Sequence, residues 1–390
     1  MENFSNNGMT MKTNWQTKKL EEVLEYEQPT QYIVSSTSYK EDYETPVLTA
    51  GKSFILGKTK EKKGIFPAKD LPVIIFDDFT TATKFVDFPF KVKSSAMKIL
   101  HPVKNISDAK FLFYIMQNIS FDHTGIHKRY WISEYSKIEI PLPALAEQKR
   151  IVKKLDEVFE KVATAKENAE TNLQNSKELF RSYLQSVFAK PGKDWEEKKL
   201  KEIGVTQTGL TPKTANKKYY GNFVPFITPA DIDISGNGSV RYDSKGLSEE
   251  GLEVGRKIKK NSVLMVCIGA TIGKVGFATR EVSCNQQINT LTPFDGYDAK
   301  LFYYILSTKS FFNKVIKGSS QATLPIINKG KWENLSVSFP KSLSEQKTIV
   351  KKLYALSLET KKLEKIYEQK LTNLEELKKS VLQQAFTGKL

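Results

Sequence analysis

Apolar and small residues recur every three or four positions along residues 146–189, a stretch that contains no proline and no glycine. The repeating positions are Ile151, Leu155, Val158, Val162, Ala165, Ala169, Leu173, Ser176 and Leu179. Steps of four and three define a heptad seam with one skip near its middle. A helix of this size is roughly 65 Å long at 1.5 Å per residue. Because a globular core does not cover so narrow a seam, the pattern predicts a partner helix.

The partner helix is predicted from the same chain. Adding 198 to each seam position gives Ile349, Leu353, Leu356, Thr360, Leu363, Tyr367, Leu371, Leu374 and Leu377. The skip recurs at the same place, and the string Glu-Gln-Lys recurs at 147–149 and 345–347. Two unrelated amphipathic helices would not share register, skip and flanking strings. We therefore interpret the chain as an internal duplication.

A globular segment precedes each helix, so the expected order is globule, helix, globule, helix. The first globule opens at Trp15 and the second at Trp195, in similar strings. We expect a flexible tail at 1–14, globular domains at 15–145 and 191–343, and long helices at 146–190 and 344–390. The predicted fold class is α+β: two repeated mixed α/β globules separated by two long antiparallel helices, which form a coiled coil with pseudo-twofold symmetry.

The two globules are predicted to share strands and a helix, because similar strings recur at offsets between 179 and 198. The pairs are 46–49 with 225–228, 71–76 with 262–267, 83–86 with 273–275, 111–119 with 301–308, and 138–143 with 335–340. Short apolar runs between turn residues are typical of buried strands. The changing offsets indicate insertions in surface loops around one common architecture.

Charge changes the functional picture. The chain has 60 Lys and Arg against 44 Asp and Glu, a net charge of +16. No apolar run reaches the length of a membrane helix, and the amino-terminal residues have no apolar signal core. The two cysteines form no CxxC pair, so we expect reduced core thiols in a cytoplasmic protein. A basic surface of this size favours a polyanionic partner, with nucleic acid first.

Motifs for catalysis are not found in the sequence. Gly57-Lys58-Thr59 resembles the end of a phosphate-binding loop, but Gly51 lies one residue too far upstream. Gly269–Gly273 lacks the dinucleotide-binding pattern, and no Asn/Asp-Pro-Pro-aromatic string of an adenine methyltransferase is present. Asp77-Asp78 stands in the wrong order for a metal-dependent nuclease. We expect no metal site and no catalytic residue in this chain.

Clusters of basic and polar residues on predicted loops remain as candidate DNA contacts. Lysine and arginine neutralise phosphates, and glutamine can read base edges. In the first globule the candidates are Lys58, Lys60, Lys62, Lys63, Lys84, Lys128 and Arg129. In the second globule they are Lys213, Lys217, Lys218, Tyr219, Lys274, Lys317 and Gln321.

The order of two globules and two long helices, together with several strings, resembles the specificity subunit of type I restriction–modification systems. The resemblance is carried by the helix entries, the ending at 381–390 and strings in the second globule. These strings are Thr208–Pro212, Tyr219–Gly221, Val224–Ile232, Gly269–Val275 and Asn285–Gln287. The first globule has different strings at 45–52 and 75–81, which suggests another branch of recognition domain.

The resemblance implies a non-catalytic DNA-recognition subunit. Each globule would be a target recognition domain for one half of a bipartite, asymmetric site, and the helix pair would set the spacer and dock two modification subunits. S-adenosylmethionine, ATP and Mg²⁺ would be bound by partner subunits, two of them motor–nucleases. The residues expected to pair the helices and dock the partners are Ile151, Leu155, Val158, Leu173, Leu179, Ile349, Leu353, Leu356, Leu371 and Leu377.

Two other classes stay open from the residues alone. A self-contained DNA enzyme would need a cofactor or metal site. A coiled-coil DNA-binding or scaffold protein outside a restriction system would share the helices and, in the scaffold case, bind no specific duplex.

Overall fold

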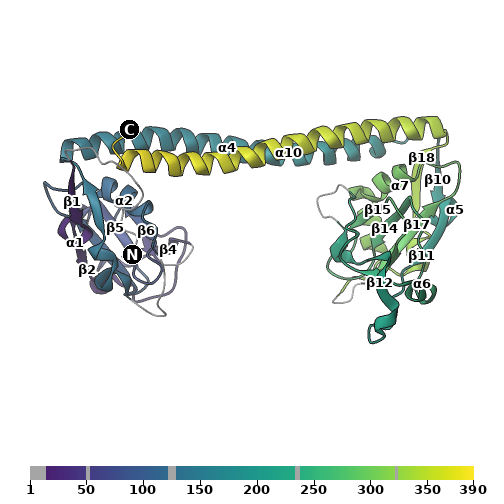
Figure 1. The fold of residues 1–390 in the computed structure, drawn as a ribbon, viewed down its shortest axis with the longest axis horizontal. Helices are drawn as coiled ribbons and strands as arrows, with labels where there is room; N and C mark the ends of the chain where they lie inside the picture. The colour runs from purple at the N-terminus through teal and green to yellow at the C-terminus, as the bar shows by residue number, and fades with distance from the viewer. Residues whose placement is uncertain (1–14, 50–52, 122–128, 233–237, 321–323) are drawn as a thin grey trace. The chain divides into compact units, whose positions relative to one another are not determined.

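A computed structural model describes residues 15–49, 53–121, 129–232, 238–320 and 324–390. The chain divides into two compact units (Figure 1). The first unit takes the described residues up to Ala169 together with Gln369–Leu390, and the second takes those of Glu170–Glu368. The 1–14 segment, expected as a flexible tail, lies outside the described residues.

The first unit consists of short strands and short helices that are interspersed along the chain. Its elements are β1 (Gln16–Lys19), α1 (Leu20–Val23), β2 (Leu24–Glu27), η2 (Pro29–Tyr32), β3 (Thr45–Leu48), β4 (Ile55–Thr59), η3 (Ala68–Asp70), β5 (Val73–Asp77), β6 (Thr83–Val86), β7 (Lys91–Val92), β8 (Met97–Pro102), α2 (Ala109–Gln117), α3 (Tyr130–Ser133), η4 (Tyr135–Lys137) and β9 (Glu139–Leu142). The long helix α4 (Leu145–Ala189) follows, one residue earlier than the predicted start.

The second unit follows a closely related order. Its elements are β10 (Trp195–Lys199), α5 (Leu200–Ile203), β11 (Gly204–Thr208), η5 (Lys217–Tyr219), β12 (Tyr220–Ile227), η6 (Pro229–Asp231), β13 (Gly246–Leu247), α6 (Glu249–Val254), β14 (Ser262–Val266), β15 (Val275–Ala278), β16 (Ser283–Cys284), β17 (Ile288–Pro293), α7 (Ala299–Leu306), α8 (Lys309–Gly318), α9 (Lys329–Trp332) and β18 (Ser336–Pro340). The second long helix, α10 (Leu343–Phe386), begins one residue before the predicted start.

The strand order confirms the internal duplication. A four-stranded sheet has the order β2-β8-β5-β6 in the first unit and β11-β17-β14-β15 in the second. A three-stranded sheet, β4-β3-β7 or β13-β12-β16, contains one parallel pair in each unit. In that pair Val47 lies opposite Lys91, and Phe226 lies opposite Ser283. The first and last strands of each unit pair antiparallel, so each globule closes where its long helix begins.

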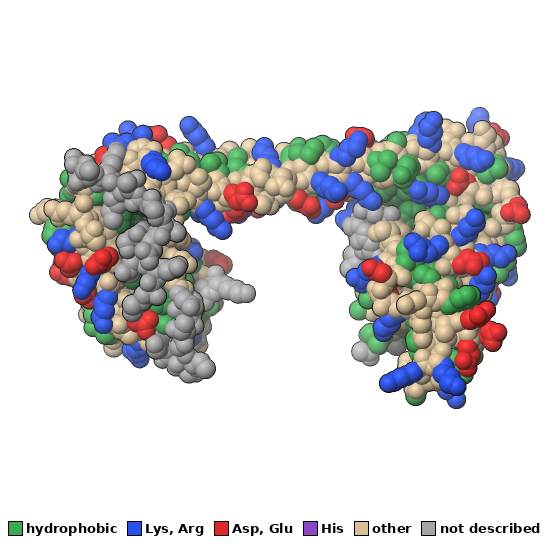
Figure 2. Space-filling view, in the orientation of Figure 1, with side chains coloured by type: hydrophobic (Ala, Val, Ile, Leu, Met, Phe, Trp, Pro, Cys, Tyr) green, Lys and Arg blue, Asp and Glu red, His purple; other side chains and the backbone are tan. Residues whose placement is uncertain are grey.

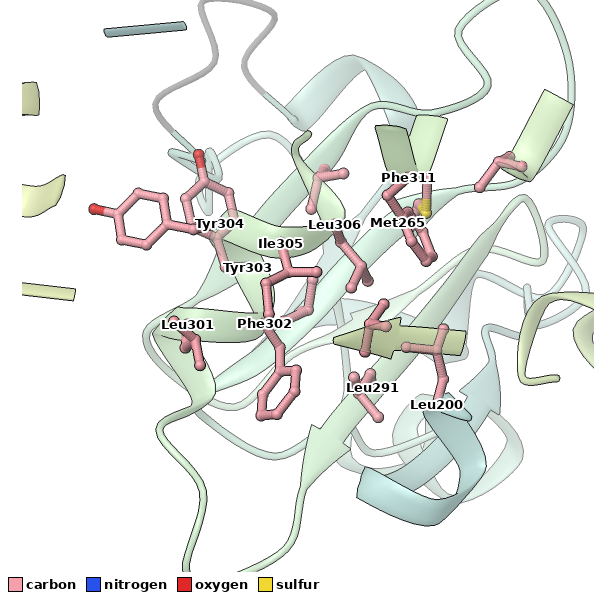
Figure 3. Close-up of a cluster of buried hydrophobic side chains, with 14 of the residues drawn as sticks. Leu200, Met265, Leu291, Leu301, Phe302, Tyr303, Tyr304, Ile305, Leu306 and Phe311 are labelled. Atoms are coloured by element: carbon pink, nitrogen blue, oxygen red, sulfur yellow. The ribbon is translucent and has the colours of Figure 1, made fainter. Parts of the chain in front are cut away.

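The largest hydrophobic cluster of the second unit lies between its four-stranded sheet and helices α7 and α8. Figure 3 shows Leu301, Phe302 and Leu306 of α7 packed with Met265 and Leu291 of the sheet. The burial pattern of β14, in which every residue is buried, explains why its sequence is a continuous apolar run. β5 is buried in the same way in the first unit.

The long helices pair antiparallel within the first unit. Lys166 of α4 bonds Glu375 of α10 at 2.7 Å, and Arg150, nearer the start of α4, bonds the carbonyl of Leu390 at 2.9 Å. Near that end Phe386 packs edge-on against Phe111 of α2, with ring centroids 5.5 Å apart. The last turn of α10 therefore completes the core of the first unit.

Most positions of the predicted helix seam are buried or half-buried. Ile151, Leu155 and Leu353 are buried, and the half-buried positions include Val158, Leu173, Ile349, Leu356 and Leu371. Within the second unit, Phe180 and Leu184 of α4 share one core cluster with Leu353 of α10.

Three predicted seam positions differ from the structure. Leu179 is 50% exposed, Leu377 is 46% exposed and Leu363 is 38% exposed. After Ser176 the buried face of α4 advances by four residues to Phe180, because 3.6 residues per turn do not keep a run of three-residue steps in register. On α10 it is Lys378, next to Leu377, that covers the ring of Phe159, with its ammonium 5.4 Å from the ring centre.

A second attachment between globule and helix differs between the units. In the first unit Lys110 and Tyr114 of α2 both bond the carboxylate of Asp156 on α4, the lysine at 2.7 Å. In the second unit Lys300 of α7 lies over the ring of Tyr354 on α10, 4.1 Å from its centre. Tyr354 is the position that matches Asp156, so an ion pair has been exchanged for a cation–π contact.

A buried glutamine joins the first globule to its long helix. Gln148 is fully buried at the start of α4. Its side-chain carbonyl accepts the N–H of Asp108 at 2.8 Å, directly before α2. Its amide nitrogen donates to the carbonyls of Ile106 and Pro143, each at 2.9 Å. One side chain therefore ties the helix to the connection before α2 and to the strand end before α4.

The same joint recurs in the second unit. Gln346 is fully buried, accepts the N–H of Asp298 at 2.9 Å and donates to the carbonyl of Pro340 at 2.8 Å. Asp298 caps α7 as the matching aspartate caps α2. The repeated Glu-Gln-Lys string thus has a structural reason at its central residue.

We expect Gln148→Ala to destabilise the first unit by about 2–3 kcal/mol, because three backbone groups lose a partner and each lost bond costs about 1 kcal/mol or more. Calorimetric unfolding and hydrogen exchange of α2 would measure the loss. Gln174→Ala, at an exposed glutamine of the same helix, is the control. Equal stability of the two variants would contradict the role of the buried amide.

Candidate nucleic-acid interface

The basic residues at 58–63 lie on β4 and on the segment that follows it. Lys58 is half-buried in β4, and Lys60, Lys62 and Lys63 are exposed. Glu61 points the other way and accepts the N–H groups of two residues, Ser35 and Ser36, each at 3.0 Å. The segment therefore presents three ammonium groups to solvent while its single carboxylate holds it to the domain.

The environment of Glu61 keeps that carboxylate ionised. Burial by itself raises the pKa of Glu61, but hydrogen bonds from the Ser36 N–H and the Lys91 ammonium hold it below its ordinary value. Glu61 is thus a charged anchor at neutral pH.

Other candidates of the first unit lie on separate elements. Lys84 is exposed on β6, with its ammonium 5.9 Å from the centre of the Phe54 ring. Arg129 is exposed at the residue before α3, and its neighbour Lys128 lies outside the described residues. Two buried acceptors fix the start of α3: the Asp78 carbonyl binds the Tyr130 N–H at 3.0 Å, and the Asp78 carboxylate binds the Trp131 N–H at 2.9 Å.

In the second unit the structure brings Lys213, Lys217 and Lys218 together on one exposed turn that ends at η5. Hydrogen bonds hold its backbone: the Lys218 N–H donates to the Asn216 side chain at 3.2 Å, and the Ser248 hydroxyl donates to the Lys218 carbonyl. Tyr219, also a candidate, is half-buried. We call residues 213–219 the basic turn. Figure 2 shows Lys and Arg side chains distributed over this unit.

The remaining candidates of the second unit are not equivalent. Lys274 is half-buried and donates to the carbonyl of Pro229 at 3.1 Å, so it joins two loops. Lys317 is exposed in the last turn of α8. Gln321 lies outside the described residues.

Lys84 and Lys274, predicted to match, do not occupy the same position of the repeat. In β5 the third residue, Ile75, lies opposite Lys84, and in β14 the third residue, Leu264, lies opposite Gly276. The strand register therefore aligns Lys84 with Gly276. The similar short strings align Lys84 with Lys274, two residues before the position that the strand register gives.

Polar residues from two loops of the second unit meet at one end of its sheet. The Thr211 hydroxyl donates to the side chain of Gln286, and the Asn285 amide donates to Gln287 at 2.9 Å. Gly209 permits this approach, because a Cβ there would lie 2.1 Å from the Asn285 carbonyl. Both loops belong to strings that carry the family resemblance. The sequence does not show that they meet, since 75 residues separate Thr211 from Gln286.

Phe223 is a second feature that charge patterns do not reveal. It is 61% exposed, the highest value among the exposed large hydrophobic residues of the described part of the chain. It lies where the pairing of β12 with β13 shifts between Tyr220 and Val224, four residues after the basic turn ends. An exposed aromatic ring on the segment that follows the lysines is suited to contact a base step.

Cys267 and Cys284 are buried, and burial raises the pKa of each thiol to about 12. Within the described ranges no group of three or more His, Cys, Asp or Glu residues is placed to hold a metal ion. Among these residues, too, none of the helices is long and apolar enough to span a membrane.

The duplicated fold, the helix pair and the basic loops agree with the comparison to known families. The chain belongs to the type I restriction modification DNA specificity domain family, whose model matches residues 12–173 and again residues 192–373. Its two repeats are therefore two copies of that domain.

The relatives that match most of this chain are specificity subunits. The specificity subunit of the Escherichia coli type I restriction enzymes EcoR124I and EcoR124II is 33% identical over 348 residues, which cover 85% of this chain and 84% of the relative. The specificity subunit HsdS of Thermoanaerobacter tengcongensis shares the fold with a TM-score of 0.60 at 20% identity, over 99% of this chain and 100% of its own.

The fold is also shared by a chain from a structure concerned with complex assembly and conformational transition of the type I R-M system. That likeness has a TM-score of 0.75 at 20% identity, and it covers 98% of this chain and 100% of the other.

The loop that Lys274 joins also contains a charged anchor. Asp231 is buried and accepts the N–H and the hydroxyl of Thr228 at 2.9 and 2.6 Å. Burial by itself raises the pKa of Asp231. Hydrogen bonds from Ser244 and Thr228 and the nearby Arg241 charge lower the pKa by more than burial raises it, so the pKa lies below its ordinary value. The folded state therefore favours the carboxylate.

We expect Asp231→Asn to destabilise the second unit at pH 7 by about 1–3 kcal/mol, the contribution of hydrogen bonds to a charged group. Since the folded pKa is the lower one, this contribution is complete above the unfolded pKa of about 3.9 and is lost as the pH falls through the folded pKa. Denaturant unfolding at pH 7 and at acid pH should give a flatter profile for the variant. Asp243→Asn, at an exposed position, should keep the original profile; identical profiles for all three chains would refute the anchor.

Proposed function

We propose that this chain selects the DNA sequence on which a type I restriction–modification complex acts. Each globular domain reads one half of a bipartite, asymmetric site. The two long helices set the length of the unread spacer and dock two methyltransferase subunits. The observation that carries this proposal is the duplication itself: each unit repeats one fold, carries its own exposed lysines and is joined to a long helix through a buried glutamine.

Charge supports duplex DNA as the ligand. The net charge is +16, and in both units lysines are exposed on backbone segments that hydrogen bonds hold in place. Such lysines neutralise phosphates and orient a domain on the duplex. The amide groups of Asn285–Gln287 and the Thr211 hydroxyl are the kind of groups that read base edges in the major groove.

The chemistry is proposed to reside in partner subunits. The two thiols of this chain are buried and protonated, and the acidic residues discussed above serve as structural anchors. We assign S-adenosylmethionine to the methyltransferase subunits, and ATP with Mg²⁺ to two motor–nuclease subunits where these are present. The exposed Leu179 and Leu377 are candidates for docking, and the cytoplasm is the proposed compartment.

Mapping of methylated adenines tests the proposal directly. Cells that express this chain with its methyltransferase subunits should methylate one bipartite sequence, and cells without the chain should not. Replacing residues 15–145 by the matching domain of a relative should change one half of that sequence and leave the other half intact. Methylation by the purified chain alone, or a change in both halves, would contradict the proposal.

Binding to a duplex with the mapped site should weaken steeply with salt, with a log–log slope of about −0.9 for each phosphate neutralised. Triple substitution of Lys213, Lys217 and Lys218 by Ala should reduce that slope by up to about 3. Fluorescence anisotropy from 50 to 300 mM salt measures it. An unchanged slope would exclude the basic turn from the interface.

Phe223→Ala should weaken binding to the second half-site by about tenfold, because an apolar side chain inserted at a base step contributes a few kcal/mol at most. Phe294→Ala is the matched control: Phe294 is 49% exposed, and it follows β17 at the end opposite the Asn285–Gln287 loop. Equal affinities of the two variants would show that Phe223 does not contact DNA.

A further inference from the structure

A lysine that was not among the DNA-contact candidates lies buried beneath the basic segment of the first unit. Lys91 is on β7 and is 3% exposed. Its ammonium donates to the carbonyls of Lys63 at 2.7 Å and Gly64 at 3.1 Å, and it pairs with the Glu61 carboxylate at 3.2 Å. A buried ammonium needs such partners to offset its lost hydration. All three partners come from one short stretch of chain.

The stretch is therefore attached to the domain from within. Glu61 connects it to the backbone of Ser35 and Ser36, and Lys91 connects it to β7. Gly64 has φ +63°, and a Cβ at this position would lie 2.6 Å from the carbonyl of Gln31. The glycine thus lets the chain turn closely over the ammonium group.

The outer side of the same stretch carries exposed charge. Lys60, Lys62 and Lys63 are all exposed. Lys62 and Lys63 also line a shallow surface pocket whose wall includes Lys91. The Lys91 ammonium is buried and already bonds three protein acceptors, so it is not itself a phosphate ligand. Its effect on DNA would pass through the position of its neighbours.

The second unit lacks this attachment. Ser283 occupies the position of Lys91 in the repeat. Lys91 lies opposite Val47 in the parallel strand pair of the first unit, and Ser283 lies opposite Phe226, the residue that matches Val47 in the second unit. Ser283 is buried, and its hydroxyl has no hydrogen-bond partner in the described structure. A Cβ on Gly255 would lie 3.3 Å from that hydroxyl, where the first unit has Gly64 beside the ammonium. The end of helix α6 takes the place of the basic segment.

We propose that Lys91 is a positioning residue of the first recognition domain: it holds residues 60–64 so that Lys60, Lys62 and Lys63 face the DNA backbone. This inference rests on the proposed function. Without the attachment these residues would have to be ordered at the moment of binding, and the lost conformational entropy would reduce affinity. The device acts on the first half-site alone.

Lys91→Met tests the proposal in the full chain assembled with its methyltransferase subunits. The probe is a duplex with the bipartite site found by methylation mapping, alongside a duplex with only the second half-site intact. We expect affinity for the complete site to fall by about 10- to 100-fold. The log–log slope of affinity against salt should become shallower by the contribution of about two or three phosphates, at about 0.9 for each. Binding to the second half-site should not change. Ser283→Ala, the matched substitution in the other domain, should leave both measurements unaltered.

A double-mutant cycle separates positioning from general damage. Lys62→Ala with Lys63→Ala should weaken binding of the original chain, yet add little to Lys91→Met, because those lysines are already misplaced in that variant. Additive losses would overturn the proposal, as would an unchanged salt slope. Glu61→Gln keeps Lys91 in place and weakens the attachment; it should give a smaller loss of the same kind, and it decides the matter if Lys91→Met does not fold.

The two levels of inference fail differently. If the unsubstituted complex shows no sequence-specific binding or methylation, the proposed function is wrong. If that complex is specific and Lys91→Met leaves the first half-site unaffected, only the role of Lys91 is wrong.

Discussion

The buried side-chain amide of Gln148, repeated at Gln346, is the constraint on which the rest of the structure depends. A long two-helix pair offers no preferred place for a globule, since its surface repeats every turn. The glutamine removes that freedom by bonding the start of the helix to the connection before α2 or α7 and to the strand end that leads into the helix. An unsatisfied amide in this buried position would be costly, so only one arrangement is stable. The buried glutamine therefore fixes the position of each globular domain, with its loops, relative to the start of the helix that follows it.

Duplication preserved this joint and allowed the surfaces to diverge. Both units keep the strand orders of their two sheets, but the attachment beside the joint is ionic in one and cation–π in the other. The position below the recognition loops changed from a buried ammonium at Lys91 to the small Ser283. Core and joint are therefore the shared part, and the loops above them are the part that varies. This division is what a protein needs if it is to read two different sequences with one fold.

The sequence predicted the helices, the duplication and the buried strands because each of them depends on regular spacing. It was less informative where a contact depends on residues far apart in the chain. Phe180 lies on the buried face of α4 in place of Leu179, which follows from the real helical period in a long helix and not from a local pattern. Lys84 and Lys274 carry similar strings but differ in strand register. Lys91 is absent from the sequence candidates, because nothing in its neighbours along the chain shows the three acceptors that surround its ammonium.

The closing of the first unit by Phe386 has a consequence for the order of synthesis. Most domains can fold once their own segment has left the ribosome. The second unit is one continuous stretch of chain, Glu170–Glu368, and meets that condition before translation ends. The first unit does not, because Leu382, Ala385 and Phe386 belong to its core and are made after the whole of the second unit. The domain that emerges first is therefore the one that is finished last, and a chain that lacks residues 382–386 would be damaged in its first domain, not in its second.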